Sequence, residues 1–222
     1  MHHSLTFHTE TLHCLPSGAL FWPAQGLLCV SDLHLGKSER LARRGGTLLP
    51  PYETRATLSR LEADLTATDA TTIICLGDSF DDSAALDGLD ETDRLWLIRL
   101  IAGRNWVWVA GNHDAGPLNI AGTHLAQVKR PPLTFRHIAE PNEMAEISGH
   151  YHPKLRLAGQ AHRCFLVDAK RMILPAYGAY TGGLWSFDPA LSGLMAPDSI
   201  ALACTAGRVL AVPMPRSSTK AR

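Results

Sequence analysis

Residues 26–34 read GLLCVSDLH, and this stretch contains the pattern that decides the fold, a short apolar run that ends at polar side chains. The run is apolar and includes a β-branched valine, which is typical of a buried strand. Asp32 and His34 follow it and are two residues apart, so on extended backbone both side chains point to the same side. We therefore predict a strand that delivers Asp32 and His34 to a site at its carboxyl end.

The same pattern recurs four times along the chain. Further apolar runs occupy residues 71–76, 105–110, 132–135 and 144–147. They lead into Gly77 and Asp78, into Gly111, Asn112, His113 and Asp114, into Arg136 and His137, and into Gly149, His150, Tyr151 and His152. The glycines allow sharp turns and a close approach of the backbone to a ligand. Because ligands of open α/β sheets bind beyond the carboxyl ends of the strands, we expect these segments to meet at one site.

Two segments between the early strands have helical spacing. Residues 52–65 follow two prolines and place Leu58, Leu61 and Leu65 on one face. Residues 91–101 begin with acidic side chains and place Leu95, Ile98 and Ile101 on one face. Alternating strands and helices, followed by a strand-rich second half, predict an α/β fold in which mixed sheets pack between helices.

The composition is that of one soluble globular domain. The chain has 222 residues without repeats or linkers, so we expect a single domain over residues 1–212 and a flexible tail over residues 213–222. Its 21 basic and 21 acidic residues cancel, so no overall charge favours nucleic acid. The five cysteines form no CxxC pair and indicate reduced, strand-buried thiols. Without a signal-like or bilayer-length apolar segment, we expect a cytoplasmic protein with no membrane contact.

The polar residues at the strand ends suit a metal site. Carboxylate, imidazole and amide oxygen together fit Mn, Fe, Zn or Co better than the all-oxygen shell of calcium. Each piece also has an ordinary alternative, since Gly-Asp at a strand end is commonly a turn and an isolated Asp-x-His is commonly surface polarity. Their succession along one chain favours metal binding.

In this order, DLH at 32–34, GDxxD at 77–81, GNHD at 111–114, a downstream histidine and GHYH at 149–152 resemble the calcineurin-like metallophosphoesterase superfamily. The resemblance implies a four-layer αββα sandwich of two mixed β-sheets flanked by helices. It also implies two divalent metal ions, with Mn preferred and Fe, Zn, Co or Ni as alternatives. One ion would be held by Asp32, His34, Asp78 and His152, and the other by Asp78, Asn112, His137 and His150, with Asp78 bridging.

The resemblance further implies a reaction in which a metal-bridging hydroxide attacks phosphorus and His113, which is no ligand, acts as general acid. Asp81 is the last residue of GDSFD, and a hydrogen bond from its carboxylate to His113 would favour the protonated acid. Its neighbour Asp82 fits a helix N-cap as well. We choose His137 over His124 as the ligand because His137 ends an apolar run.

Three longer stretches resemble the bacterial ligase-associated DNA damage response endonucleases. They are GKSERLARRGGTLLPPYETRATLSRL at 36–61, GHYHPKLRL at 149–157 and LPAYGAYTGGL at 174–184. This resemblance implies a phosphodiesterase that cuts DNA in repair, with a repair DNA ligase and a helicase as functional partners. The alternatives are a phosphatase or pyrophosphatase acting on nucleotides or other small phosphate esters, and a non-catalytic scaffold that retains the fold.

A local basic surface is the physical argument for DNA. Lys37, Arg40 and Arg44 are three and four residues apart, so a helix would present them on one face beside the metals, where they could bind substrate phosphates. Lys154 and Arg156 extend the same idea, although either group also fits a solvated face. Tyr177, Tyr180 and Trp185 suit either base stacking or core packing. Strand preference, oligomeric state and metal identity stay open.

Overall fold

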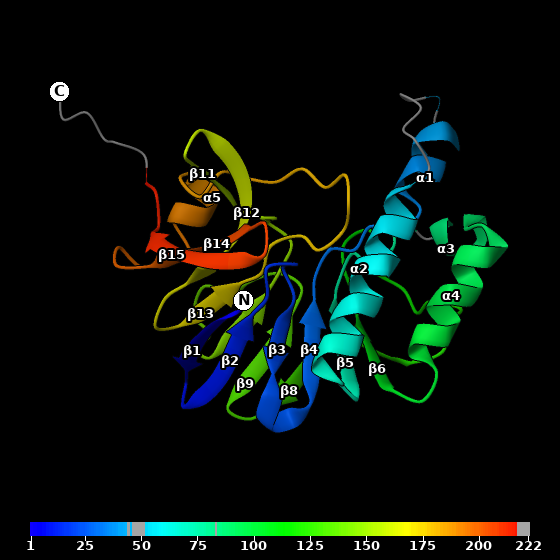
Figure 1. The fold of residues 1–222 in the computed structure, drawn as a ribbon, viewed down its shortest axis with the longest axis horizontal. Coiled ribbons are helices and arrows are strands. Elements are labelled where there is room, and N and C mark those ends of the chain that lie inside the picture. Colours follow the sequence, from blue (N-terminus) through cyan, green and yellow to red (C-terminus); the bar gives the residue numbers. More distant parts are fainter. Residues whose placement is uncertain (44, 46–51, 83, 217–222) are drawn as a thin grey trace.

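The computed structural model describes residues 1–43, 45, 52–82 and 84–216, and its centre is formed by two facing β-sheets (Figure 1). The first sheet consists, in spatial order, of β1 (His3–Phe7), β2 (Glu10–Cys14), β3 (Leu20–Trp22), β4 (Leu27–Val30), β5 (Thr72–Leu76), β6 (Asn105–Val109) and β7 (Thr123–Leu125). Strands β1 to β4 pair antiparallel, and β4 to β7 pair parallel.

The second sheet is also mixed. Its spatial order is β15 (Arg208–Pro213), β14 (Ile200–Thr205), β12 (Gln160–Val167), β13 (Arg171–Ile173), β10 (Glu146–Ser148), β9 (Leu133–Arg136) and β8 (Gln127–Arg130). Strand β11 (Lys154–Leu157) pairs with β12 in a hairpin that projects from the sheet (Figure 1). The parallel pairs are β13 with β10 and β10 with β9, so both predicted sheets are mixed as expected.

Three apolar clusters separate four layers. The first lies between the sheets and includes Trp22, Phe135 and Phe165. The second packs the first sheet against its helices, which are α1 (Lys37–Arg43), α2 (Glu53–Thr68), α3 (Ala85–Gly88) and α4 (Glu91–Ile101). The third covers the outer face of the second sheet, where the only named helix of the described residues is the short α5 (Pro189–Ser192). The predicted sandwich is confirmed, and α5 makes its fourth layer thin. A 3-10 turn, η1 (Pro23–Gln25), precedes β4.

The sequence predicts the buried face correctly for α2 but not for α4. In α2, Leu58, Leu61 and Leu65 are all buried, as the spacing predicts. In α4 the assigned face is wrong, because Leu95 and Ile98 are 58% and 42% exposed. The apolar residues of α4 itself are spread around the helix, so their spacing is compatible with more than one buried face. Packing on the sheet buries Leu97, Leu100 and Ile101.

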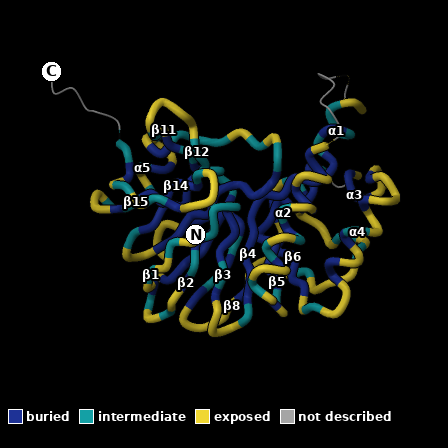
Figure 2. Tube along the Cα trace, in the orientation of Figure 1, coloured by how far each residue is buried: buried dark blue, intermediate teal, exposed yellow. Residues whose placement is uncertain are grey.

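The remaining expectations about the chain concern its cysteines, its tail and membranes. All five cysteines are free, buried and located in strands, as predicted. Strand β15 continues through Pro213, and the next residue, Met214, is buried, while residues 217–222 of the proposed tail lie outside the described residues. No helix in the described part of the chain has the length and apolar character that crossing a bilayer requires. Figure 2 shows that burial is concentrated in the strands and their carboxyl ends.

Candidate active site

The carboxyl ends of strands from both sheets meet at one edge of the sandwich. Strands β4, β5 and β6 are parallel neighbours, so the segments that follow them leave the first sheet on the same side. Strands β9 and β10 are parallel neighbours in the second sheet. The backbone N–H groups of Asp32 and His34 donate to the carbonyl oxygens of Gly77 and Asp78, at 3.2 Å and 3.0 Å. The loops after β4 and β5 are thereby fixed to one another.

One group of potential ligands consists of Asp32, His34 and His152. One ligand atom from each lies within 4.8 Å of the other two. Nε2 of His34 is 3.4 Å from Nε2 of His152, which in turn is 3.2 Å from Oδ1 of Asp32. Residues 120 positions apart in the chain therefore converge on a space of metal-ion size.

A second group consists of Asp78, His137 and His150. Nε2 of His137 lies 3.3 Å from Oδ2 of Asp78 and 3.3 Å from Nδ1 of His150. Oδ1 of Asn112 is 3.1 Å from the same nitrogen. The two groups adjoin, since Nδ1 of His137 is 3.9 Å from Oδ1 of Asp32. All seven proposed ligands thus lie together, whereas His124 lies on β7 and belongs to none of the ligand groups found among the described residues.

The orientation of the histidines fits divalent cations. Nδ1 of His34 is 2.8 Å from Oδ1 of Asp81, and Nδ1 of His137 is 3.0 Å from the carbonyl oxygen of Leu76. Because both acceptors require a proton on Nδ1, each ring turns its Nε2 toward the other ligand side chains, where it can bind a cation once that nitrogen carries no proton. Nε2 of His34 and Nε2 of His152 lie 3.4 Å apart, a separation that suits two ligands of one cation.

The backbone at the proposed ligands is unusual. Five of them have left-handed φ values: Asp32 (54°), His34 (47°), Asp78 (45°), His150 (70°) and His152 (47°). The interpretation that Asp32 and His34 share a side because their backbone is extended is therefore wrong. A left-handed residue with a Cβ costs about 1–2 kcal/mol, and such strain is concentrated at functional sites.

Close contacts with other segments explain the three glycines singled out from the sequence, and a Cβ on Gly77 would lie 2.3 Å from Nδ1 of His137. A Cβ on Gly149 would lie 1.7 Å from Oγ of Ser31, and one on Gly111 would lie 2.2 Å from the backbone nitrogen of Asp78. No L side chain fits at either position. Both glycines let a loop from another strand press against the segments that carry Asp32 and Asp78.

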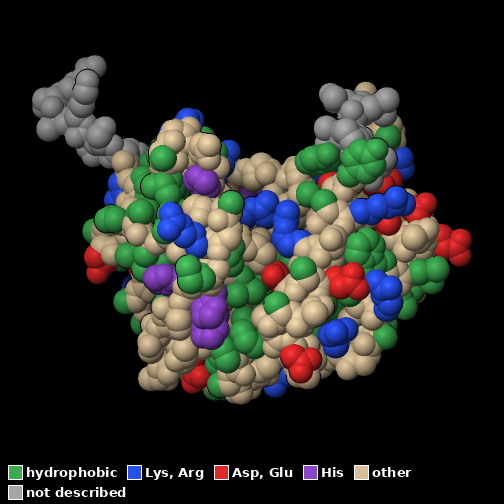
Figure 3. Space-filling model, in the orientation of Figure 1, with side chains coloured by type: hydrophobic (Ala, Val, Ile, Leu, Met, Phe, Trp, Pro, Cys, Tyr) green, Lys and Arg blue, Asp and Glu red, His purple; other side chains and the backbone are tan. Residues whose placement is uncertain are grey.

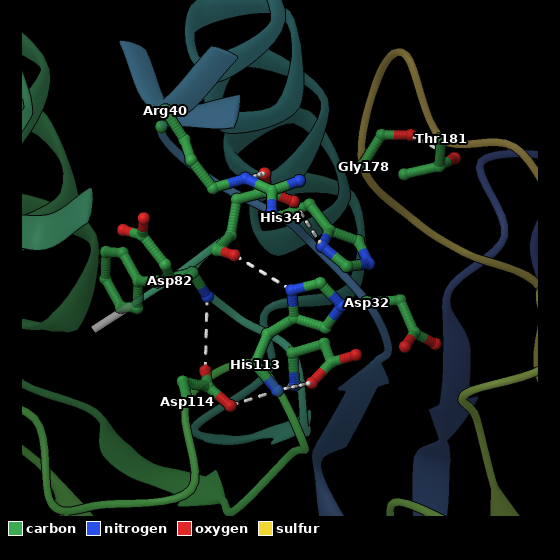
Figure 4. Close-up of polar contacts among 12 residues, drawn as sticks. Asp32, His34, Arg40, Asp82, His113, Asp114, Gly178 and Thr181 are labelled. Atoms are coloured by element: carbon green, nitrogen blue, oxygen red, sulfur yellow. Dashed lines mark hydrogen bonds and ion pairs between the residues drawn. The ribbon is translucent and has the colours of Figure 1, made fainter. Parts of the chain in front are cut away.

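Asp114 has a role that the sequence did not reveal. Its buried carboxylate accepts hydrogen bonds from the backbone N–H groups of Asp78, Ser79, Phe80 and Gly111. Burial raises the pKa of Asp114, and these backbone hydrogen bonds oppose that rise. Asp114 is the last residue of the GNHD motif, which was the available signal. It holds the loop of Asp78 in place (Figure 4).

Asp81 does not pair with His113 through its side chain, contrary to the expectation. Its buried carboxylate contacts Nδ1 of His34 and forms an ion pair with Nε of Arg40 on α1. Burial alone would raise the pKa of Asp81, but the hydrogen bond with His34 and the charges of His34 and Arg40 outweigh burial and lower it. A charged Asp81 therefore fixes the ring of a proposed metal ligand.

His113 is held by backbone groups. Its Nδ1 donates to the carbonyl oxygen of Asp81 at 2.8 Å, and its backbone N–H donates to Oδ1 of Asp78 at 2.9 Å. Its ring packs edge-on against that of His34, with the centroids 5.1 Å apart (Figure 4). Since a carbonyl oxygen only accepts, the tautomer is fixed and Nε2 is left for proton exchange.

The carboxylates of the site are held in their charged form. Burial would raise the pKa of Asp78, but hydrogen bonding and charge from His137, together with the N–H of His113, hold it well below its usual value. The same balance lowers the pKa of Asp32, where His152 and His137 outweigh burial. Burial alone would lower the pKa of His137, but the hydrogen bond with Asp78 and the charges of Asp32 and Asp78 outweigh burial and raise it.

One of the three residues of the proposed basic face on α1, Arg40, is neutralised by an ion pair. Arg40 is paired with Asp81. Arg43, which is not part of that face, is paired with Asp82, and Oδ1 of Asp82 also accepts from the backbone N–H of Ala84 just before α3. Lys37 forms no ion pair among the described residues, although its charge helps to lower the pKa of Asp81. Arg44 lies outside the described residues.

Of the three aromatic residues considered for base stacking, Tyr177 is fully buried and donates to Asp64. It is therefore a core residue.

A two-sheet sandwich whose strand ends gather adjoining Asp/His ligand groups is typical of a metallophosphoesterase. The family model for calcineurin-like phosphoesterase matches residues 27–180, and the chain belongs to this family. It is a metal-dependent phosphoesterase. The chain is also similar to the crystal structure of Pseudomonas putida nuclease MPE, with 28% sequence identity and a TM-score of 0.72 over 96% of this chain and 100% of that one. Comparison with curated proteins gives no significant match.

Proposed function

We propose that the protein is a phosphodiesterase that cuts DNA as an endonuclease. The observation that carries the proposal is the pair of adjoining ligand groups, Asp32, His34 and His152 beside Asp78, His137 and His150. When bound there, two divalent ions would activate water as the nucleophile and offset negative charge on the phosphate. The similarity to a nuclease supports a phosphodiester of nucleic acid as the substrate.

The chain's own residues supply the rest of the reaction. The lowered pKa values of Asp32 and Asp78 keep both carboxylates charged at neutral pH. The carbonyl oxygen of Asp81 holds the proton on Nδ1 of His113 and orients the ring, so the doubly protonated imidazolium would donate its Nε2 proton to the leaving oxygen. Asp81 orients His34 and acts as a positioning residue in this proposal.

The surroundings of the site suit a polymer. A surface pocket beside Asn112 and His137 and another beside His152 flank the ligand groups. Figure 3 shows a hollow between the part of the molecule that carries β11 and β12 and the part that carries α1. An open site of this kind admits a chain that continues past the scissile bond.

The finer proposals follow from the sequence resemblance. They are Mn as the working ion, a place in cytoplasmic DNA repair, and a repair ligase and a helicase as functional partners.

A substrate and metal screen tests the function. The wild-type protein is assayed in Mn, Fe, Zn, Co, Ni and Mg against bis-p-nitrophenyl phosphate, p-nitrophenyl phosphate, nucleotides, and single- and double-stranded DNA. We expect a preference for the diester over the monoester and nicking of plasmid DNA. A preference for monoesters or nucleotides without DNA cleavage would favour the phosphatase or pyrophosphatase. Full activity in Asp78→Asn would refute the site, and an absence of both metal uptake and turnover would indicate a scaffold.

A further inference from the structure

Beside the metal ligands lies a basic pocket that the proposed reaction does not use. Its lining consists of His152, Lys154, Ala161, His162, Arg163, Ala176, Thr181 and Gly182. No carboxylate contributes to it. Since the whole chain has no net charge, this local excess of cations is a specific feature of the fold.

The two cations of the pocket are placed against each other. Lys154 on β11 and Arg163 on β12 are direct cross-strand partners, and like charges in such positions destabilise a sheet. Neither forms an ion pair within the described ranges. Burial lowers the pKa of Arg163, and the neighbouring charge of Arg60 lowers it further. An anion between these side chains would relieve their repulsion.

The pocket is built rather than incidental. Arg163 donates from one terminal nitrogen to the carbonyl oxygens of Ala176 and Tyr177, at 3.0 Å and 3.1 Å. This fixes its guanidinium in place and leaves its other donors available, in the planar arrangement that matches phosphate oxygens. Thr181 is held by a hydrogen bond from its hydroxyl to the carbonyl oxygen of Gly178.

The pocket is continuous with the metal site. His152 belongs both to its lining and to the first ligand group. The loop that carries Thr181 is attached to the site through Gly178, whose N–H donates to the carbonyl oxygen of Asp32 at 3.1 Å, and Figure 4 shows this loop beside Asp32 and His34. Figure 3 shows Lys and Arg side chains in the hollow between the two raised parts of the molecule.

We propose that this pocket binds a non-scissile phosphate of a nucleic-acid strand whose neighbouring phosphodiester lies at the metal ligands. The proposal rests on the proposed function and specifies the substrate, since a small diester has no second phosphate to place there. Lys154 and Arg163 would bind the phosphate directly. On α1, Arg40 is already engaged with Asp81, so this pocket is the better-supported contact with the backbone.

The test compares a short single-stranded oligonucleotide with bis-p-nitrophenyl phosphate. Lys154→Ala removes one cation from a half-buried strand position, together with the contact of Nζ over the ring of Trp185, so the melting temperature of the variant is measured alongside. We expect the ratio of kcat/KM for the oligonucleotide to that for the small diester to fall about tenfold, the typical value of one charged hydrogen bond. The salt dependence of log KM for the oligonucleotide should weaken by about 0.7, which corresponds to one lost phosphate contact.

Two further variants complete the experiment. Lys154→Arg keeps the positive charge and should keep both the ratio and the salt slope. Lys170→Ala removes an exposed lysine between β12 and β13, outside the pocket, and serves as the matched control.

Four results would overturn the proposal. If the ratio is unchanged in Lys154→Ala, or if both substrates lose activity in parallel, the pocket binds no flanking phosphate. If only nucleotides with a free phosphate depend on Lys154, the pocket serves a small substrate. If the wild type hydrolyses the small diester but no nucleic acid, the proposed function fails, and the subsite fails with it.

Discussion

Replacing Asp81 tests whether this carboxylate positions a metal ligand or supports the catalytic acid. Its Oδ1 lies 2.8 Å from Nδ1 of His34, and its other oxygen pairs with Nε of Arg40. Asp81→Asn keeps an oxygen that accepts from His34 but loses the negative charge. Its amide NH2 group would then face the Arg40 guanidinium, and two donors cannot hydrogen-bond to each other. Asp81→Ala removes both contacts. The second change should therefore have the larger effect on metal binding.

The magnitude follows from the hydrogen bond to the ligand. Loss of the partner that orients a ligating histidine typically lowers metal affinity by about 10- to 100-fold. We expect about tenfold for Asp81→Asn and about 100-fold for Asp81→Ala, the latter equal to about 2.7 kcal/mol. The side chain of Arg40 is 20% exposed and can regain water, so the free energy of unfolding should fall by only about 1–2 kcal/mol.

Calorimetric titration of Mn into the metal-free protein measures the effect. One of two binding events should weaken, because of the two proposed ion sites only the one with Asp32 and His152 includes His34, whose other group joins it to Asp81 and His113. Asp82→Asn is the control, since the neighbouring carboxylate pairs with Arg43 at the surface. If Asp81→Ala binds both ions with unchanged affinity but has an altered pH profile of kcat, Asp81 does not position a metal ligand. That result would instead support the expectation that Asp81 acts on the catalytic acid His113.

Three further predictions concern catalysis, packing and pH. His113→Ala should lower kcat by about 100-fold or more with little change in metal content, as measured by turnover and by metal analysis of the purified variant. Gly149→Ala should reduce soluble protein and melting temperature, because its Cβ would lie 1.7 Å from Oγ of Ser31; a variant with wild-type stability would contradict the packing. The lowered pKa of Asp78 means that its contribution to the stability of the metal-free protein is present above about pH 4 and is lost as the pH falls through the folded-state pKa. In EDTA, acid unfolding of the wild type should therefore be steeper than that of Asp78→Asn, and equal slopes would contradict the pKa shift.

The sequence by itself determined the strands, their polar ends and the order of the motifs. The strand after Gly26 and the residues Asp32 and His34 could be predicted because an apolar run, β-branching and turn chemistry are local properties of the sequence. The face of α2 was predictable for the same reason, since its polar residues leave one apolar stripe. The resemblance then placed the proposed ligands at the strand ends, where the structure brings them together.

Only the tertiary structure decided which partners the side chains meet. Three such contacts depend on segments that are distant in sequence. Asp81 pairs with Arg40 and His34, Asp114 accepts from four backbone N–H groups, and α4 buries one particular face against the sheet. The same is true of the basic pocket, because the pairing of β11 with β12 brings Lys154 opposite Arg163. Spacing along a chain fixes periodicity, whereas charge pairing and burial depend on what packs against each face.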